Sequence, residues 1–136
     1  LAVPQIVLVA VLIWVVGCSG TGARDYQLPD DPKHSKNFTF GKQVAGNIVP
    51  TKDPIDRIGV SGLREVVAEI KNTTNSPITF WYKFDWYDAQ GFPAGGEPRW
   101  EKKTLQGNEH SNISSIAKGQ GAVKYNIAVQ RNSPYN

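Results

Sequence analysis

The segment from Ile78 to Tyr87 constrains the fold more than any other part of the sequence, because bulky apolar residues occupy every second position along it. Successive side chains of a β-strand point to opposite faces, so a period of two places one row of apolar and aromatic side chains on a single face. A helix would scatter the same residues around its surface. We therefore predict a central strand with an inward row of Ile78, Phe80, Tyr82, Phe84 and Trp86.

A weaker alternation recurs along the rest of the chain. A strand is predicted from Arg64 to Asn72, although residues 61–70 also fit the apolar stripe of a helix, which remains an alternative there. Hairpin turns are predicted at residues 72–77 and 88–91. These elements predict an all-β fold, an antiparallel β-sandwich of about seven strands. The remaining strands are expected at residues 38–40, 43–49, 55–60, 99–105, 112–117 and 122–129.

The composition limits the classes of partner. With 15 Lys and Arg against 12 Asp and Glu, the formal net charge is only +3, far from the dense basic surface of a protein that binds duplex nucleic acid. We therefore expect no nucleic-acid partner. The single cysteine excludes an intramolecular disulfide, and a chain of 136 residues suits one folded domain.

An apolar run precedes the predicted sandwich. Residues 6–16 contain no charge and no proline, and as a helix they would cover about 16 Å, roughly half of the hydrocarbon core of a bilayer. A signal peptide over residues 1–17 therefore fits better than a membrane-spanning helix. Because the sequence has no Met, and no Lys or Arg before this run, we expect the natural chain to begin upstream of Leu1.

The run ends in Val15-Val16-Gly17-Cys18, which resembles the lipobox of bacterial lipoproteins. The resemblance implies that Cys18 becomes the first residue of the mature chain and carries a covalent lipid, which would anchor the protein to a membrane. Ser19, at a place where Asp favours retention in the inner membrane, indicates an outer-membrane lipoprotein that faces the periplasm. The alternative is a lone cysteine behind an uncleaved anchor helix.

A polar segment separates the lipid anchor from the predicted domain. Residues 18–37 contain small, charged and proline residues without apolar periodicity. Such a segment is typical of a flexible tether, and its root-mean-square reach is about 22–26 Å. We expect the β-sandwich domain to occupy residues 38–136.

The central segment contains a characteristic set of residues: Asn72, Pro77, Ile78, Thr79, Tyr82, Phe84, Trp86, Tyr87, Asp88, Ala89 and Gly91. In these residues it resembles the YcfL-like family of small lipoproteins of Gram-negative bacteria. This resemblance implies an immunoglobulin-like β-sandwich and a lipoprotein that faces the periplasm, and the family has no assigned enzymatic activity. The resemblance covers about residues 46–129, and the loop that begins at Phe92 differs from the family pattern.

Catalytic and metal-binding patterns are missing from the sequence. His34 falls in the predicted tether, and His110 has no second His or Cys nearby to complete a metal site. The sequence contains no nucleophile elbow, P-loop or zincin motif. Asp85 and Asp88 are close enough to suggest a carboxylate pair, but a surface charge and a turn residue explain them more simply. We expect no enzymatic activity, no metal and no cofactor apart from the lipid on Cys18.

Three aromatic residues fall outside the predicted core row. Trp81 and Tyr87 share the outward face of the central strand, and Trp100 ends the Gly- and Pro-rich segment 92–100. Such side chains either pack beneath a loop, for which 92–100 is long enough, or form a binding surface. The favoured function is a non-enzymatic interaction module that binds an envelope protein and acts in envelope maintenance. The alternative is binding of peptidoglycan, another glycan or a small ligand, with these aromatics as stacking platforms.

Overall fold

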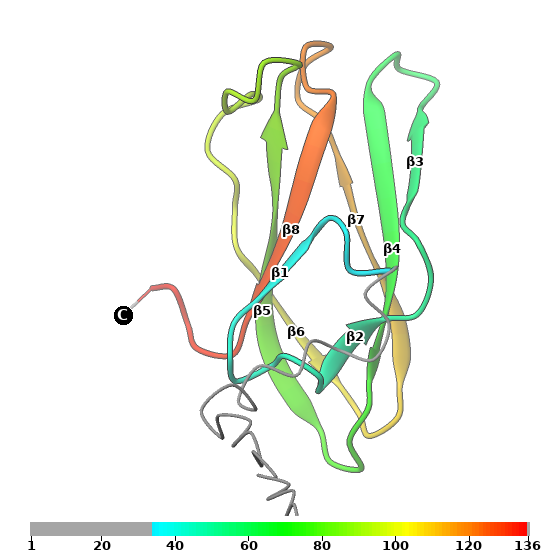
Figure 1. The fold of residues 1–136 in the computed structure, drawn as a ribbon, viewed down its shortest axis with the longest axis vertical. Coiled ribbons are helices and arrows are strands. Elements are labelled where there is room, and N and C mark those ends of the chain that lie inside the picture. The colour runs from blue at the N-terminus through cyan, green and yellow to red at the C-terminus, as the bar shows by residue number, and fades with distance from the viewer. Residues whose placement is uncertain (1–33, 136) are drawn as a thin grey trace, which may run out of the picture.

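The computed structural model describes residues 34–135, which form an all-β sandwich with no helix among them (Figure 1). Two sheets face each other. The first, the β5 sheet, has the order β1-β8-β5-β6. In the second, the β4 sheet, β7 pairs along one edge of β4, and β2 and β3 pair with successive parts of its other edge. The strands are β1 (Phe38–Phe40), β2 (Ile48–Pro50), β3 (Ile55–Ile58), β4 (Arg64–Asn72), β5 (Ile78–Tyr87), β6 (Glu101–Leu105), β7 (His110–Ile116) and β8 (Lys124–Gln130).

The predicted β-sandwich is confirmed, with differences in strand number and direction. The described residues contain eight strands rather than about seven. The β5 sheet is not wholly antiparallel, because β1 runs parallel to β8, with Phe38 opposite Ile127. Parallel neighbours need a long connection, and β1 and β8 meet this condition as the first and last strands of the fold. Residues 64–70 belong to β4, so the helical alternative for this segment is wrong.

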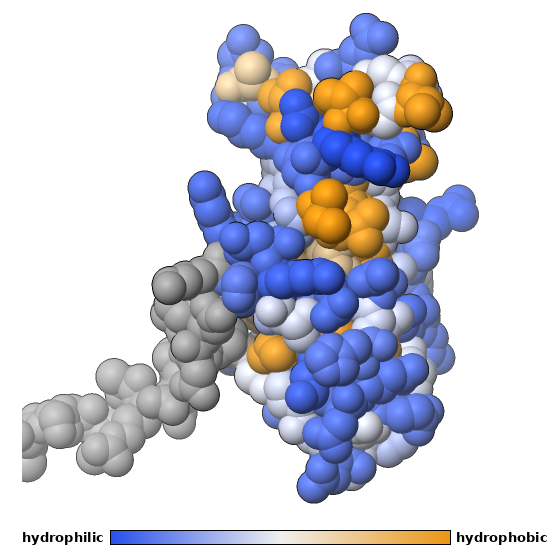
Figure 2. Space-filling view, turned by 90° about the vertical axis from the view of Figure 1, so that its right-hand side faces the viewer, coloured by the Kyte–Doolittle hydropathy of each residue, from blue (hydrophilic) through white to orange (hydrophobic). Residues whose placement is uncertain are grey.

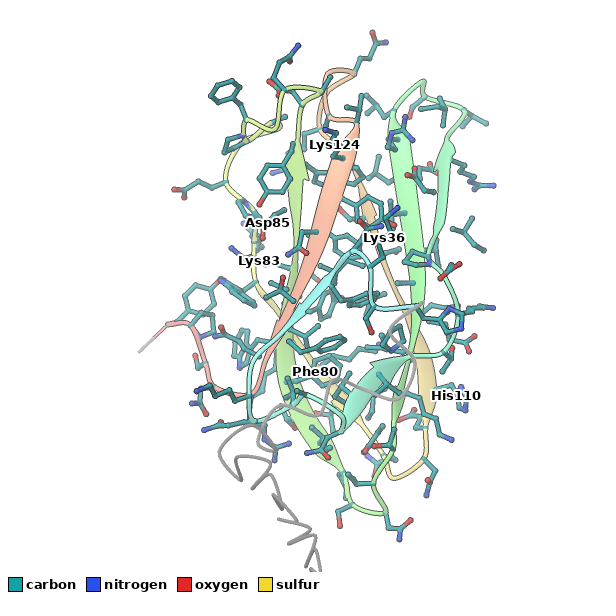
Figure 3. All side chains as sticks on the ribbon, viewed as in Figure 1. Lys36, Phe80, Lys83, Asp85, His110 and Lys124 are labelled. Carbon is teal, nitrogen blue, oxygen red and sulfur yellow. The ribbon has the colours of Figure 1, made fainter. Side chains whose placement is uncertain are left out.

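The core lies between the two sheets, and β5 supplies its largest side chains. Phe80 is completely buried, and Phe84 and Trp86 are 7% and 9% exposed. Figure 3 shows Phe80 in the space between the layers. The predicted inward row is therefore confirmed at these positions, whereas Tyr82 is only half-buried because its hydroxyl reaches the Glu101 carboxylate at 3.2 Å. The β4 sheet contributes the buried row that contains Val66.

One predicted strand is shorter and lies later than expected. The strand predicted at residues 43–49 is only β2 (Ile48–Pro50), because the chain turns before it. The Val44 and Ala45 N–H groups donate to the Gly41 carbonyl at 3.1 and 3.0 Å, and Gly46 has a φ of 81°. Val44 is nevertheless completely buried, so it reaches the core from a turn and not from a strand.

The segment 72–77 is a crossover between the sheets, not the predicted hairpin, since it joins β4 to β5. Asn72, completely buried, fixes this crossover with its side chain. Its amide Nδ2 donates to the carbonyls of Ser76, Leu105 and Gln106 at 2.8, 3.1 and 3.0 Å. Its Oδ1 accepts from the Thr74 N–H at 2.9 Å and from the Thr74 hydroxyl at 2.8 Å. The Asn72 side chain thus joins the end of β4 to the end of β6, which lies in the other sheet. These hydrogen bonds explain the change of sheet better than a turn type does.

The outer face of the β4 sheet mixes ion pairs with separate apolar side chains (Figure 2). Arg57 Nη2 lies 3.2 Å from Glu65 Oε2 on the neighbouring strand, and Lys52 Nζ lies 3.4 Å from Glu69 Oε2. Such exposed pairs add little stability, about 0–1 kcal/mol each. Ile55 and Ile58, at the two ends of the edge strand β3, are 56% and 57% exposed. Charged residues between them protect this edge from pairing with other strands.

Candidate interaction site

Trp81, the first of the three predicted surface aromatics, packs against other parts of the same chain. Its ring meets the Tyr135 ring edge-on, with 5.6 Å between centroids and 76° between planes. The ammonium of Lys102, on β6, lies 5.9 Å from the centroid of the Trp81 ring. In Figure 1 the C-terminal segment leaves the lower end of β8 and runs to the left, on the side of the β5 sheet that faces away from the β4 sheet. Trp81 is therefore packed against the C-terminal segment.

Tyr87 lies at the far end of the same strand, where the connection to β6 begins. It forms an isolated antiparallel bridge with Pro93, while its carbonyl accepts the Val123 N–H at 2.9 Å. Its half-buried side chain borders a shallow hollow of about 590 Å³ that also has Tyr125 and Lys124 on its walls. Tyr87 and Trp81 thus have separate surroundings at opposite ends of the outer face of β5.

Trp100 lies directly before β6 and is linked to the outer face of β5 through Lys83. The Lys83 ammonium is 5.0 Å from the centroid of the Trp100 ring and 3.1 Å from Asp85 Oδ1. Figure 3 shows Lys83 and Asp85 next to each other beside β5. A cation over an indole contributes about 0.5–1 kcal/mol at an exposed site. Asp85 is therefore the partner of a lysine, and Trp100 is held at the side of the β5 sheet.

A groove opens beside Trp100 because β6 pairs with only the first half of β5. β6 begins at Glu101, opposite Tyr82, whereas β5 continues to Tyr87. The connection 88–100 arches away from this half of β5 (Figure 1). The space left between β5, this connection and β7 measures about 500 Å³, within the range of about 300–1,000 Å³ typical of ligand pockets.

The groove exposes an unpaired strand edge of β5. Trp86 presents its carbonyl to this side, where it accepts the Ala94 N–H at 2.9 Å, and Tyr87 presents its carbonyl to the β8 side. Because alternate residues of a strand point their N–H and C=O groups to opposite sides, Phe84 also points toward the groove. On the β8 side Phe84 lies opposite Ile127, whose N–H donates instead to the Asn37 carbonyl at 2.7 Å, and no β6 residue pairs with Phe84 among residues 34–135. The backbone groups of Phe84 are therefore outside the ladder of hydrogen bonds.

The walls of the groove carry three cations, Lys83, Arg99 and Lys118, against two carboxylates, Glu97 and Glu101. Trp86 Nε1 donates to Ser115 Oγ of β7 at 3.1 Å, across the gap between the sheets. Burial raises the pKa of Tyr82 to about 12, and the neighbouring Glu101 carboxylate adds to the effect. Tyr82 is therefore a neutral hydroxyl that donates to that carboxylate. Arg99 and Lys118, on opposite walls, belong to no ion pair within the described part of the chain.

The other titratable residues singled out in the sequence have structural partners. Asp88 Oδ1 accepts the N–H groups of Gln90 and Phe92 at 3.0 and 2.9 Å, as predicted for a turn residue. His110 Nδ1 lies 3.4 Å from Glu69 Oε1 on the outer face of the β4 sheet, and His34 Nδ1 lies 2.9 Å from Asp53 Oδ1. The described residues contain no group of three or more His, Cys, Asp or Glu side chains that could hold a metal.

The hydrogen bond from Thr51 and then that from His110 lower the pKa of the Glu69 carboxyl, and Lys52 adds a Coulomb contribution. Thr51 Oγ1 donates to Glu69 Oε1 at 2.6 Å. A carboxylate held in this way is a stable surface anion on the sheet opposite the groove.

Sequence reasoning identified Trp100 but not the groove beside it. The signals were the ten residues of β5 against the five of β6, and the long Gly- and Pro-rich connection between them. A connection of this length between paired strands is uncommon unless it is functional. Where the pairing stops, however, depends on contacts between distant parts of the chain.

The anchor residue predicted from the sequence, Cys18, and the signal peptide at residues 1–17 lie outside the described residues. A search of residues 34–135 for helices long and apolar enough to cross a membrane found none.

Three comparisons relate the chain to known proteins. A family described as "Protein of unknown function (DUF1425)" matches residues 37–131, and no curated protein matches the chain. The crystal structure of Campylobacter jejuni cj0090 is similar, with a TM-score of 0.61 and 15% identity over 71% of this chain and 98% of that one. A DUF1425 member from Shewanella sp. pv-4 has a TM-score of 0.55 and 20% identity over 65% of this chain and 79% of that one. At these identities the two structures support the fold alone.

Proposed function

The chain belongs to the family described as "Protein of unknown function (DUF1425)", and we propose that it is a YcfL-like lipoprotein of the bacterial envelope that acts as a non-enzymatic interaction module. A lipid on Cys18 holds it at the outer membrane, facing the periplasm. The Val15-Val16-Gly17-Cys18 motif after a short apolar run supports the anchor. Two or three acyl chains give firm anchoring where one gives only weak binding.

The groove beside β5 carries the interaction part of the proposal. It is bordered by an unpaired strand edge, the indole of Trp86, and two cations, Arg99 and Lys118, without carboxylate partners among the described residues. A backbone N–H or C=O group that has no hydrogen bond to water or protein lowers the stability of the fold, and proteins normally cover such groups. A folded domain that leaves such an edge open next to an aromatic anchor is suited to binding another macromolecule.

Photo-crosslinking in intact cells tests this role. A photoreactive amino acid replaces Glu97 on the groove wall, and the matched control replaces Arg131, an exposed residue outside the groove. We expect a discrete crosslinked envelope product from position 97 and none from position 131. Equal crosslinking at both positions, or none at either, contradicts the interaction role of the groove.

Fatty-acid labelling tests the anchor independently. Cys18→Ala removes the only thiol in the chain. We expect this variant to lose radioactive fatty-acid label and to leave the outer-membrane fraction, while Ser19→Ala keeps its label. Label that survives Cys18→Ala rules out lipidation at this residue.

The hollow beside Tyr87 supports glycan binding as a second candidate function. It is lined by Tyr87 and Tyr125 together with the polar residues Asn37, Asp56 and Lys124, a combination of residue types suited to binding a sugar. Because Tyr135 already covers Trp81, Tyr87 is the predicted aromatic best placed for this role. Co-sedimentation with peptidoglycan that is lost in Tyr87→Ser and kept in Trp100→Ser favours this function.

A further inference from the structure

We infer that the hollow beside Tyr87 binds a sugar that carries a negatively charged group, a carboxylate or a phosphate. This inference rests on the glycan binding proposed above for the same hollow, and it names the class of sugar. The hollow measures about 590 Å³, within the range of about 300–1,000 Å³ typical of ligand pockets. Its backbone, hydroxyl and charged groups all favour a ligand that accepts hydrogen bonds and carries negative charge.

The hollow lies where β8 extends beyond β1. β1 begins at Phe38, opposite Ile127, whereas β8 begins at Lys124, so β1 pairs with none of the first three residues of β8. The Ile127 N–H donates to the Asn37 carbonyl at 2.7 Å, on the β1 side of β8. Because alternate residues of a strand point their backbone groups to opposite sides, the N–H of Tyr125 points to this side as well. The hollow therefore has a backbone donor at its border.

The side chain of Tyr125 adds a buried hydroxyl to the wall of the hollow. Tyr125 is only 9% exposed, and its hydroxyl accepts a hydrogen bond from Asn37 Nδ2 at 3.2 Å. Burial raises the pKa of Tyr125; the bond from Asn37 opposes this effect, and the carboxylates of Asp56 and Asp53 add to it. The hydroxyl therefore keeps its proton. Among residues 34–135 it is bonded to Asn37 alone, as an acceptor, so a ligand oxygen can accept this proton.

The charge of the hollow is positive. Two cations, Lys36 and Lys124, line it together with one carboxylate, Asp56, and Figure 3 shows Lys124 near the upper end of β8 and Lys36 below it. Asp56 Oδ1 lies 2.9 Å from Arg64 Nη1 on β4, so this carboxylate already has a cationic partner. Neither lysine forms an ion pair within the part of the chain that the structure describes, and Lys124 Nζ donates to the Ala89 carbonyl at 3.3 Å. Two cations without carboxylate partners attract an anion.

The uncharged part of a sugar would meet a different part of the wall. Tyr87 and Val123, both half-buried, line the hollow with apolar surface. Gly91 also lines it, and its φ of 91° lies in a region that residues with a Cβ seldom adopt. No atom lies within 4 Å of the position that a Cβ on Gly91 would take, so the turn leaves open space there. An apolar wall and open space beside cations suit a sugar with a charged substituent better than a bare ion.

A titration followed by nuclear magnetic resonance tests this preference for charge. The full chain, in micelles of an amine-oxide detergent that presents neither sugar nor phosphate, is titrated with N-acetylmuramic acid and with N-acetylglucosamine, which lacks the lactyl carboxylate. We expect the acidic sugar to shift the Tyr125 amide signal and to bind at least about fivefold more tightly than the neutral one. The preference should shrink to less than about twofold in about 0.5 M salt, because salt screens exposed charges.

A second pair of probes, glucose 6-phosphate and glucose, makes the same comparison for a phosphate. Tighter binding of N-acetylmuramic acid would identify a carboxylated sugar of the peptidoglycan type, and tighter binding of glucose 6-phosphate a phosphorylated sugar of the lipopolysaccharide type. Acetate and inorganic phosphate alone should bind at least about tenfold more weakly than the better acidic sugar, because they lack the ring.

Matched substitutions test the residues. The double change Lys36→Gln and Lys124→Gln should reduce the preference for the acidic sugar to less than about twofold, with binding of the neutral sugar within about twofold of the original. The control, Lys71→Gln with Lys118→Gln, removes two cations outside the hollow and should keep the preference. Tyr125→Phe removes only the hydroxyl and should weaken the acidic sugar at least about threefold. An unchanged urea midpoint shows that each variant is folded, and Lys36→Gln alone serves where the double change is not.

Equal binding of the acidic and neutral sugars overturns the inference, as does binding of acetate or phosphate alone as tightly as the acidic sugars. The absence of any shift at Tyr125 with sugars up to about 20 mM also overturns it. If co-sedimentation with peptidoglycan is still lost in Tyr87→Ser in these cases, the hollow remains a glycan site and only its preference for an anionic sugar is wrong.

Discussion

Replacing Asn72 should destabilise the sandwich more than its position at the end of β4 suggests. The side chain is completely buried between the ends of β4 and β6. Asn72→Ala removes the donor to three carbonyls and the acceptor for the Thr74 N–H and hydroxyl. The crossover between the sheets would then lose the side chain that holds it.

The expected loss follows from how well water can replace each bond. The hydrogen bond to the Leu105 carbonyl is buried, so water cannot replace it, and its loss costs about 0.5–1.5 kcal/mol. The bonds to Ser76, Gln106 and Thr74 are partly buried, so each contributes about 0.5–1 kcal/mol. We expect a total loss of about 2–5 kcal/mol, out of the roughly 5–15 kcal/mol typical of a folded domain.

Urea unfolding followed by tryptophan fluorescence measures this loss in the full chain. With a slope of about 1–3 kcal/mol per molar urea, the midpoint should fall by roughly 1 M or more. The control is Ser76→Ala, whose exposed side chain should cost less than about 0.5 kcal/mol. A loss below about 1 kcal/mol in Asn72→Ala, or equal losses in both variants, would refute the role assigned to this side chain.

Other variants test the core, the turns and the outer faces. Phe84→Ala, at a position only 7% exposed, should cost about 3–5 kcal/mol in the same unfolding assay. Gly107→Ala should lower the melting temperature by several degrees, because its Cβ would lie 2.5 Å from backbone atoms of Asn75. Tyr135→Ala should increase the solvent exposure of Trp81, seen as a red shift in fluorescence. Thr51→Val should raise the pKa of Glu69, measured by carboxyl titration, so the variant should lose less stability as pH falls through the native pKa of this group.

The fold follows from the sequence where local alternation decides it. The period of two in β5 places Phe80, Phe84 and Trp86 in the core, and the same pattern identifies β4. The turn residues after β4 predict that the chain reverses but not which sheet it joins, because the bonds that decide this run from Asn72 to the distant end of β6. The parallel pairing of β1 with β8 is likewise a contact between the two ends of the domain.

The candidate site was less accessible to sequence reasoning than the fold. Alternation correctly places Trp81 and Tyr87 outside the core row, but it cannot show that Tyr135 packs on Trp81. The groove results from the point where β6 stops pairing at Glu101. No local pattern marks that point, since residues 99–105 read as one strand. The position of Lys83 between Trp100 and Asp85 also depends on where the chain stops pairing with β5.

Hydrogen exchange of the β5 amides in the free, full-length chain tests most directly whether the edge of β5 is open. The Phe80 amide lies in the segment that pairs with β6, and the Phe84 amide faces the groove without a partner among the described residues. We predict that Phe84 exchanges at least about a hundredfold faster than Phe80, because an amide without a hydrogen bond exchanges without opening of the sheet. Equal protection of the two amides would mean that the edge is closed, and would contradict the groove as a site of interaction.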